Sequence, residues 1–341
     1  MSNFTPLQEL GEFGLINKIK ESITISNEST IVGIGDDAAV LAPHERNIVI
    51  SSDMLVEGVH FDLTFCPLKH LGYKAVAVNV SDIAAMNARP TQITVNLAIG
   101  SRYTVEAIQE LYEGMRLACE NYKVDLVGGD TTSSNSGLII SVTALGEVPA
   151  GEAVLRSTAQ VHDLICVTGD LGAAYLGLQI LEREKQAFMV NPDMQPELEG
   201  KEYLVQRQLR PEARMDVIYE LKDLGIKPTS MIDISDGLAS ELFHICTQSG
   251  VGATIYKDNL PADQQMLDTA VEMNLDPIMC ILNGGEDYEL LFTVPLSDYD
   301  KLKNHLDISI IGKITTKEEG VIIATKDGRG FPLQAQGWQH F

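Results

Sequence analysis

The sequence lacks the features that mark membrane and secreted proteins. No apolar run comes near the roughly 18 residues that span a bilayer. The first residues, MSNFTPLQELGEF, have neither the basic start nor the apolar core of a secretory signal. The five cysteines are scattered without a C-x-x-C pair, a spacing that suits neither a zinc site nor a disulfide framework. We therefore expect a protein of the reducing cytoplasm that does not associate with membranes.

Basic residues are also scarce. Lysine and arginine number 25 against 48 acids, which gives a formal net charge of -23. Such a surface repels phosphate backbones, so a nucleic-acid partner is not expected. Solubility accounts for most of these acids. A subset of aspartates lies instead in apolar stretches punctuated by glycine, and this subset needs a separate explanation.

The chain is long enough for two domains. It has 341 residues, of which 45% are hydrophobic, so a sizeable core is available. Strand-like and helix-like segments alternate in both halves, which indicates an α/β (α+β) fold. The stretch 149–160 has no strong period and marks the boundary between a first domain, 1–150, and a second, 151–341.

Hydrophobic periodicity predicts the individual elements. Helices are expected at 7–22, 71–88, 106–122, 173–182, 210–225 and 236–250. Strands are expected at 47–61, 92–100, 124–130, 137–148, 231–235, 310–314 and 320–324, and within 161–168 and 286–294. Residues 185–201 are typical of a loop.

Acids recur where an apolar strand ends or a turn opens. They are Asp36, Asp37, Asp53, Asp82, Asp130, Asp170, Asp233, Asp236, Glu286 and Asp287. A buried aspartate is costly unless it is paired or bound to a metal. So many acids from distant segments therefore suggest convergence on one place. Hard oxygen ligands without histidine or cysteine favour Mg²⁺ over a transition metal.

Simpler explanations stay open for single acids. Asp130 in LVGGDTTSS suits a type II turn, and Asp170 and Asp236 suit helix N-caps. Asp82 is different, because it lies inside an expected helix with apolar neighbours on both sides. An unpaired charge there is destabilising, so a partner is expected.

Glycine-rich turns next to these acids indicate phosphate binding. VGGDTTSS offers backbone N–H groups and hydroxyls that can cradle phosphate oxygens. The Walker motif and the protein-kinase motifs do not occur, and GIGDDA (33–38) lacks the helix that a dinucleotide fingerprint requires. There is no G-x-S-x-G. His60, seven residues after Asp53, is the one histidine near a candidate segment, and a lone histidine more often packs than acts as a base.

The motifs together resemble one family. They are GEFGLI, GIGDDAAV, SSDMLVEGVHF, KAVAVNVSDIAAMNARP, VGGDTTSS, VTGDLG, DISDGL, GGEDYELLF and the terminal GWQHF. In this order they resemble the thiamine-monophosphate kinases, part of the ATP-binding superfamily that includes aminoimidazole ribonucleotide synthetase. The resemblance runs from about Gly11 to Phe341. GDD, GGD and SDG recur across the superfamily, whereas SSD-x(6)-H, GGEDYEL and the terminal GW are more specific.

The resemblance implies a fold and an activity. The fold would be a two-domain subunit of the aminoimidazole ribonucleotide synthetase type, with the N-terminal sheet pairing across a homodimer. The reaction would transfer a phosphoryl group from ATP to thiamine monophosphate, giving thiamine diphosphate. The cofactor would be Mg²⁺, as several ions, and a monovalent cation is left open.

The resemblance also implies site residues. Mg²⁺ ligands would be Asp37, Ser51, Ser52, Asp53, Asp82, Asp130, Asp233 and Asp236. ATP contacts would be Tyr112, Gly129, Asp130, Arg156 and Ser235, and substrate contacts would be His60, Glu286 and Trp338. Asp53, Asp130 and Arg156 would be the catalytic residues.

The motifs and the residue chemistry agree on mechanism. The acceptor is a phosphate oxygen that is already ionised at neutral pH, so no general base is needed. That explains acids that hold Mg²⁺ and a site poor in histidine. Arg156 would supply positive charge, and Trp338 would stack on a substrate ring or pack the C-terminus. Two rivals remain: a sister ATP-dependent reaction, such as amidine ring closure or selenophosphate synthesis, and a non-catalytic nucleotide-binding scaffold.

Overall fold

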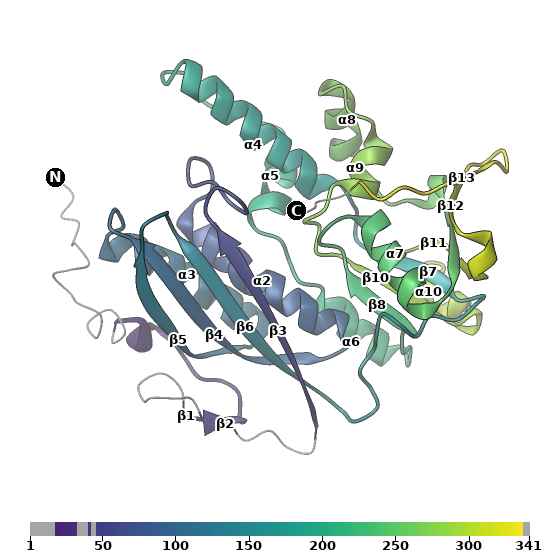
Figure 1. Cartoon of the computed structure of the whole chain (residues 1–341), viewed down its shortest axis with the longest axis horizontal. Coiled ribbons are helices and arrows are strands. Elements are labelled where there is room, and N and C mark those ends of the chain that lie inside the picture. The colour runs from purple at the N-terminus through teal and green to yellow at the C-terminus, as the bar shows by residue number, and fades with distance from the viewer. Residues whose placement is uncertain (1–17, 33–39, 42–45, 337–341) are drawn as a thin grey trace. The chain divides into compact units, whose positions relative to one another are not determined.

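The computed structural model describes residues 18–32, 40–41 and 46–336 (Figure 1). Two compact units divide the chain. The first runs to Ile83 and resumes over Ala88–Ala153, and the second comprises Ala84–Asn87 and the chain from Val154 onward. None of the helices in the described ranges combines the length and the apolar composition that a bilayer crossing requires.

The first unit is built on a four-stranded sheet in the order β3-β6-β4-β5. Its elements are β3 (Asn47–Val56), α2 (Leu68–Ala85), β4 (Arg89–Gly100), α3 (Val105–Tyr122), β5 (Asp125–Ser134) and β6 (Ile139–Val148). Helix α3 links β4 to β5, which are parallel, and the other neighbouring strands are antiparallel. The short strands β1 (Thr30–Val32) and β2 (Val40–Leu41) form a separate pair.

The two faces of this sheet differ in character. On the inner face Val95 of β4 and Val142 of β6 are buried, and Figure 1 shows α2 and α3 covering this side. On the outer face Ile50 and Met54 of β3 keep 65% and 55% of their surface exposed. Alternate residues of a strand point to opposite faces, so the burial pattern fixes which side chains can meet the helices.

Helices α2 and α3 cross in close contact through two glycines. A methyl group at Gly72 would overlap the main-chain oxygen of Leu111, and one at Gly114 would overlap that of Lys69. The lack of a side chain at both positions therefore sets the spacing of the pair that covers the sheet. The predicted helices at 71–88 and 106–122 are confirmed as α2 and α3.

A buried aspartate fastens the N-terminal segment to the sheet. Asp125, at the start of β5, has no exposed surface. Its carboxylate accepts hydrogen bonds from Ser26 N (2.6 Å), Asn27 N (2.9 Å) and Thr30 Oγ1 (2.6 Å). These bonds balance its charge and fix the chain just before the GDD motif.

The second unit is built on a seven-stranded mixed sheet in the order β13-β12-β9-β11-β7-β10-β8. Its strands are β7 (Leu164–Thr168), β8 (Ser230–Asp233), β9 (Gly252–Tyr256), β10 (Leu290–Val294), β11 (Ile308–Thr315), β12 (Val321–Ala324) and β13 (Gly330–Pro332). Its helices are α4 (Ala173–Val190), α5 (Glu202–Leu209), α6 (Met215–Asp223), α7 (Leu238–Ser249), α8 (Gln264–Glu272), α9 (Pro277–Asn283) and α10 (Tyr299–Leu302).

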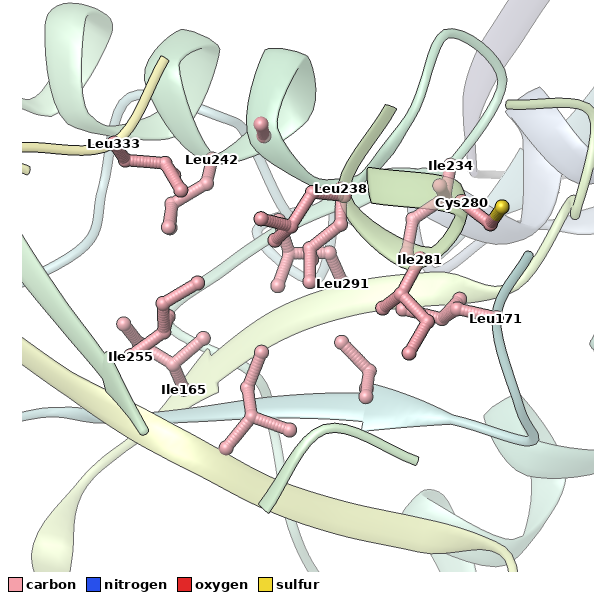
Figure 2. Packing of buried hydrophobic residues seen from close by; sticks show 14 of the residues in the cluster. Ile165, Leu171, Ile234, Leu238, Leu242, Ile255, Cys280, Ile281, Leu291 and Leu333 are labelled. Carbon is pink, nitrogen blue, oxygen red and sulfur yellow. The ribbon is translucent and has the colours of Figure 1, made fainter. Parts of the chain in front are cut away.

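One apolar cluster holds the loops of this unit in place. Figure 2 shows Leu238 and Leu242 of α7 packed above Ile165 and Leu291 of the sheet, with Ile281 of α9 beside them. All these side chains are nearly inaccessible to solvent. The loops that follow β8 and α9 are therefore anchored on both sides by the core.

The predicted elements have two kinds of error. Helices α5 and α8 and strand β9 were not predicted from the sequence. The loop predicted at 185–201 is wrong in its first part, since α4 continues to Val190. The segment EREKQAFMV contains good helix formers, and the helix carries on past the residues that pack against α5.

We expect Gly114→Ala to destabilise the first unit. The added methyl group forces α2 and α3 apart, which should lower the free energy of unfolding by about 3 kcal/mol. Urea denaturation measures this, with Glu110→Ala on the exposed face of the same helix as the control. Equal midpoints for the two variants would contradict the close crossing.

Candidate active site

The inner face of the first unit brings together three residues from two elements. Ser51 and Asp53 lie on β3, and Asp82 lies on α2. Ser51 Oγ donates a hydrogen bond to Asp82 Oδ2. The peptide N–H of Asp53 donates to Asn79 Oδ1 at 3.1 Å, and Asn79 Nδ2 donates to Ala75 O at 3.0 Å. The partner expected for Asp82 is therefore found, and strand and helix are joined at this point.

Asp53 and Asp82 repel each other. Burial, and after it the neighbouring Asp82 carboxyl, raises the pKa of Asp53 to about 6 from 3.8. Desolvation is the larger cause and the like charge of Asp82 adds to it, so the ionised form of Asp53 is costly here. A divalent cation bound between them removes that cost.

The oxygen atoms present fit Mg²⁺. Two carboxylates with a hydroxyl beside them form a hard donor set without histidine or cysteine. Within the described ranges no three His, Cys, Asp or Glu side chains form a complete metal site. That also fits, because Mg²⁺ in phosphoryl-transfer sites is usually held by one or two carboxylates and by substrate phosphates.

Two further predicted ligands point to the outer face. Ser52 follows Ser51 and faces away from α2, with its hydroxyl donating to Val142 O at 3.1 Å. Asp130 pairs in register with Asn96 of β4 and is exposed. It lies on the opposite edge strand from Asp53, about 14 Å away across three strand spacings. One ion therefore cannot bind the side chains of Asp53 and Asp130 of the same subunit.

The prediction that these acids end strands is wrong for two of them. Asp53 lies in the middle of β3 and Asp130 in the middle of β5. The type II turn considered for Asp130 does not form either. The strands continue because their backbone groups stay hydrogen-bonded to neighbouring strands, whatever the polarity of the side chains.

Two residues predicted to contact ATP are part of the packed first unit. Gly129 lies so close to β4 that a methyl group there would overlap Val95 O. Tyr112 of α3 is 6% exposed. It lines a cavity of about 150 Å³ together with Lys18, Ser22 and Arg116.

His60 lies in the turn that follows β3. Its Nδ1 accepts a hydrogen bond from Val56 N at 3.0 Å, and the peptide N–H of His60 donates to Val56 O at 2.9 Å. The neutral ring therefore carries its proton on Nε2. The nearby Glu57 carboxylate accepts from Tyr103 Oη and from Leu138 N, both at 2.8 Å, which holds this end of the sheet together.

In the second unit the loop 233–237 contains three predicted residues, Asp233, Ser235 and Asp236. Asp233 is buried, at 4% exposed. The helix N-cap considered for Asp236 is wrong, because the cap of α7 is Gly237 and has no side-chain hydrogen bond. Instead, Asp236 N donates to the carboxylate of Glu241 at 3.0 Å. The side chain of Asp236 is thus not engaged as the cap of this helix.

The predicted substrate residue Glu286 lies against this loop. Its N–H donates to Ser235 O at 2.7 Å, and Tyr288 N donates to Ile234 O at 2.9 Å. A side chain at Gly237 would collide with the backbone of Asn283. The structure therefore brings Glu286 together with Asp233, Ser235 and Asp236.

Arg156 has an anchored backbone and an exposed side chain. Its carbonyl oxygen accepts hydrogen bonds from Ser230 Oγ and Ser249 Oγ, both at 3.0 Å. The guanidinium lies at the surface of the second unit. This arrangement suits a cation that binds a ligand, because the main chain is fixed and the guanidinium is exposed.

The helix cap expected from Asp170 is supplied by a distant residue. Asp287 accepts hydrogen bonds from Gly172 N (2.9 Å) and Ala174 N (3.4 Å), at the start of α4. Asp170 instead accepts from the hydroxyl of Tyr203. The N-cap reading of Asp170 is therefore wrong, because the tertiary fold brings a different carboxylate to the helix.

Three predicted residues, Asp36, Asp37 and Trp338, lie outside the described residues. Two residues that lie beside the predicted site residues, Asn79 and Glu241, were not predicted from the sequence. Asn79 precedes Asp82 by three positions, a helical spacing that could have identified it. Glu241 is 2% exposed, and burial raises its pKa to about 8 beside Asp236 and Asp233.

Comparisons with known proteins agree with this geometry. Residues 35–148 match the family model for the N-terminal domain of AIR synthase related proteins, and residues 160–325 match the model for the C-terminal domain. The fold is thus that of the two-domain AIR synthase related class. A hydrogenase maturation protein, HypE in complex with ATP, shares the fold alone, with 20% identity and a TM-score of 0.69 over 88% of this chain and 89% of that chain.

Closer relatives define the family within this class. The thiamine-monophosphate kinase of Bacillus subtilis (strain 168) is 38% identical over 97% of this chain and 100% of its own length. That of Aquifex aeolicus (strain VF5) is 35% identical over 98% of this chain and 99% of its own. The chain belongs to the thiamine-monophosphate kinase family.

Solved structures give the same result. The thiamine-monophosphate kinase from Stenotrophomonas maltophilia K279a has a TM-score of 0.79 and 34% identity, covering 94% of this chain and 98% of that chain. AaThiL complexed with AMPPCP and TMP has a TM-score of 0.75 and 34% identity over the full length of both chains.

We expect Asp53→Asn to stabilise the metal-free protein at high pH. The folded pKa of Asp53, about 6, lies above its ordinary 3.8. The bound proton of Asp53 therefore stabilises the folded protein fully below pH 3.8, and this stabilisation is lost as the pH rises through about 6. In EDTA near pH 8 the variant should melt a few degrees above the wild type, and near pH 4 the difference should vanish.

The matched control is Asp130→Asn, because that side chain is exposed and should shift the melting temperature little. Differential scanning calorimetry across this pH range measures both variants. A melting temperature for Asp53→Asn that is unchanged or lower near pH 8 contradicts a repelling pair.

Proposed function

We propose that this chain transfers the γ-phosphoryl group of ATP directly to thiamine monophosphate, giving thiamine diphosphate and ADP. The observation that carries the proposal is the half-buried Asp53–Asp82 pair beside Ser51. It belongs to a chain that matches, over its full length, a protein solved with AMPPCP and TMP. AMPPCP is an analogue of ATP, so that complex holds an ATP analogue together with TMP.

The proposed cofactor is Mg²⁺, held in the first unit by Asp53, Asp82 and Ser51. When bound, the ion supplies positive charge that screens the repulsion between two phosphorylated reactants. Ser52 and Asp130 point to the other face of the first-unit sheet, so more than one ion is needed if they are ligands as well. Asp37, Asp233 and Asp236 are further ligands in this proposal.

The proposed contacts divide between the two reactants. Tyr112, Gly129, Asp130, Arg156 and Ser235 are assigned to ATP, and His60, Glu286 and Trp338 to thiamine monophosphate. Arg156 supplies the side-chain cation for the charge that develops on the transferred group. No residue is needed to deprotonate the acceptor, because a phosphate oxygen is already ionised.

A homodimer is part of the proposal. The outer face of the first-unit sheet exposes Ile48, Ile50 and Met54 at 40%, 65% and 55%. An apolar sheet face of this kind is normally covered by another layer. A second copy of the same sheet is the occupant we propose. A cytoplasmic location is proposed as well, supported by the five cysteines, all within the described residues, none of which forms a disulfide.

The activity is tested with purified protein, ATP, Mg²⁺ and thiamine monophosphate, with the products identified by chromatography. We expect stoichiometric ADP and thiamine diphosphate. Asp53→Asn and Asp130→Asn should each lower kcat by at least about 100-fold while circular dichroism stays unchanged. Near-normal turnover by both variants would sink the metal-site proposal, and ATP binding without ADP release would favour a scaffold.

We expect Ile50→Lys to weaken the dimer. A charge in the centre of the proposed interface stays unpaired and costs several kcal/mol of association free energy, about 3. Light scattering after size exclusion should then give a subunit mass near the monomer's 37.2 kDa. The control is Val271→Lys, since Val271 of α8 is 72% exposed on the second unit. Identical masses for the wild type and Ile50→Lys exclude this face.

A further inference from the structure

The loop that carries Glu286 has an unusual backbone. Gly285, Glu286 and Tyr288 have φ values of 71°, 57° and 52°. Left-handed backbone is unfavourable for residues with a side chain, so two of these three residues are strained. Such a conformation persists only if its surroundings hold it. What holds this loop therefore decides where the Glu286 carboxylate lies.

One side of the loop is held by the backbone of the 233–237 segment. Glu286 N and Tyr288 N donate to Ser235 O and Ile234 O, and Ile234 N donates back to Glu289 O at 2.8 Å. These bonds fix the main chain. They leave the rotation of the Glu286 side chain undetermined, because none of them involves its carboxylate.

The other side of the loop is held by α5. Arg207 of this helix donates to Asp170 O and Asp287 O, both at 3.2 Å, and to Glu289 Oε1 at 2.8 Å. The Glu289 carboxylate is 1% exposed and also accepts from Arg214 at 2.5 Å. This buried ionic network ties α5 rigidly to the loop.

The next residue of α5 reaches the carboxylate itself. Gln208 Nε2 donates to Glu286 Oε2 at 2.6 Å. Gln208 is 5% exposed, so water has little access to replace it. A short hydrogen bond to a carboxylate is among the stronger neutral-to-charged contacts, and its geometry restricts the acceptor.

We propose that Gln208 is a positioning residue that sets the direction of the Glu286 carboxylate toward thiamine monophosphate. The inference rests on the proposed function, in which Glu286 contacts that substrate. The thiazolium ring of thiamine is a permanent cation, and a carboxylate held in one rotamer is a suitable partner for it. Arg207 fixes the main chain of the loop, and Gln208 fixes its functional side chain.

The test is a double-mutant cycle on steady-state kinetics. Gln208→Met keeps the length and flexibility of the side chain but cannot donate a hydrogen bond. It should raise the KM for thiamine monophosphate about tenfold, with the KM for ATP and kcat changed less than about twofold. Gln206→Met is the matched control, since Gln206 is exposed on the same helix.

The cycle is closed with Glu286→Ala. If Gln208 acts through Glu286, then Gln208→Met has almost no further effect on KM in the Glu286→Ala background. That result supports the inference. Additive effects of the two substitutions, or equal losses for both substrates, mean that Gln208 only stabilises the fold and overturn it.

The remaining outcomes separate this inference from the function on which it rests. A raised KM in Glu286→Ala and a normal KM in Gln208→Met overturn the inference alone. A normal KM in Glu286→Ala removes the substrate contact and the inference together. A wild-type protein without thiamine-monophosphate kinase activity overturns the proposed function and, with it, the role of Gln208.

Discussion

The close approach of the Asp53 and Asp82 carboxyl groups is the constraint that defines the candidate site of the first unit. The two carboxyl groups lie close together despite the cost of their like charges, because hydrogen bonds of Ser51 and Asn79 join the strand to the helix beside them. The close crossing of α2 and α3 at Gly72 and Gly114 fixes the spacing of the two helices that cover the sheet. Burial and the neighbouring carboxyl raise the pKa of Asp53, so its ionised form is costly in the absence of a positive charge.

In the second unit, packing and hydrogen bonds hold two loops in one arrangement. The core under α7 and α9 anchors the ends of both loops (Figure 2). Direct backbone bonds join the loop of Ser235 to the loop of Glu286. The buried network of Arg207 and Glu289 then supports the strained residues from the other side. In the proposed function, the placement of the Glu286 carboxylate thus relies on residues that are themselves assigned no ligand.

Particular residues show which elements and contacts could be predicted from the sequence. The buried helix around Asp82 and the strand before Asp233 were predicted, because their periodicity is local. The positions of Asp53 and Asp130 within strands were not, since polar residues on one face of a sheet look like the end of a strand. The capping of α4 by Asp287 was not predictable either, because 115 positions separate Asp287 from Gly172.

The sequence by itself determined the α/β class and the family, because these follow from composition, local period and motif order. The tertiary structure alone decided which acids meet. Asp53 joins Asp82 and Asp130 does not, because strand register assigns each side chain to a face of the sheet. It likewise decided that Gln208 reaches Glu286, since contact between residues far apart in the chain depends on how helices and loops pack.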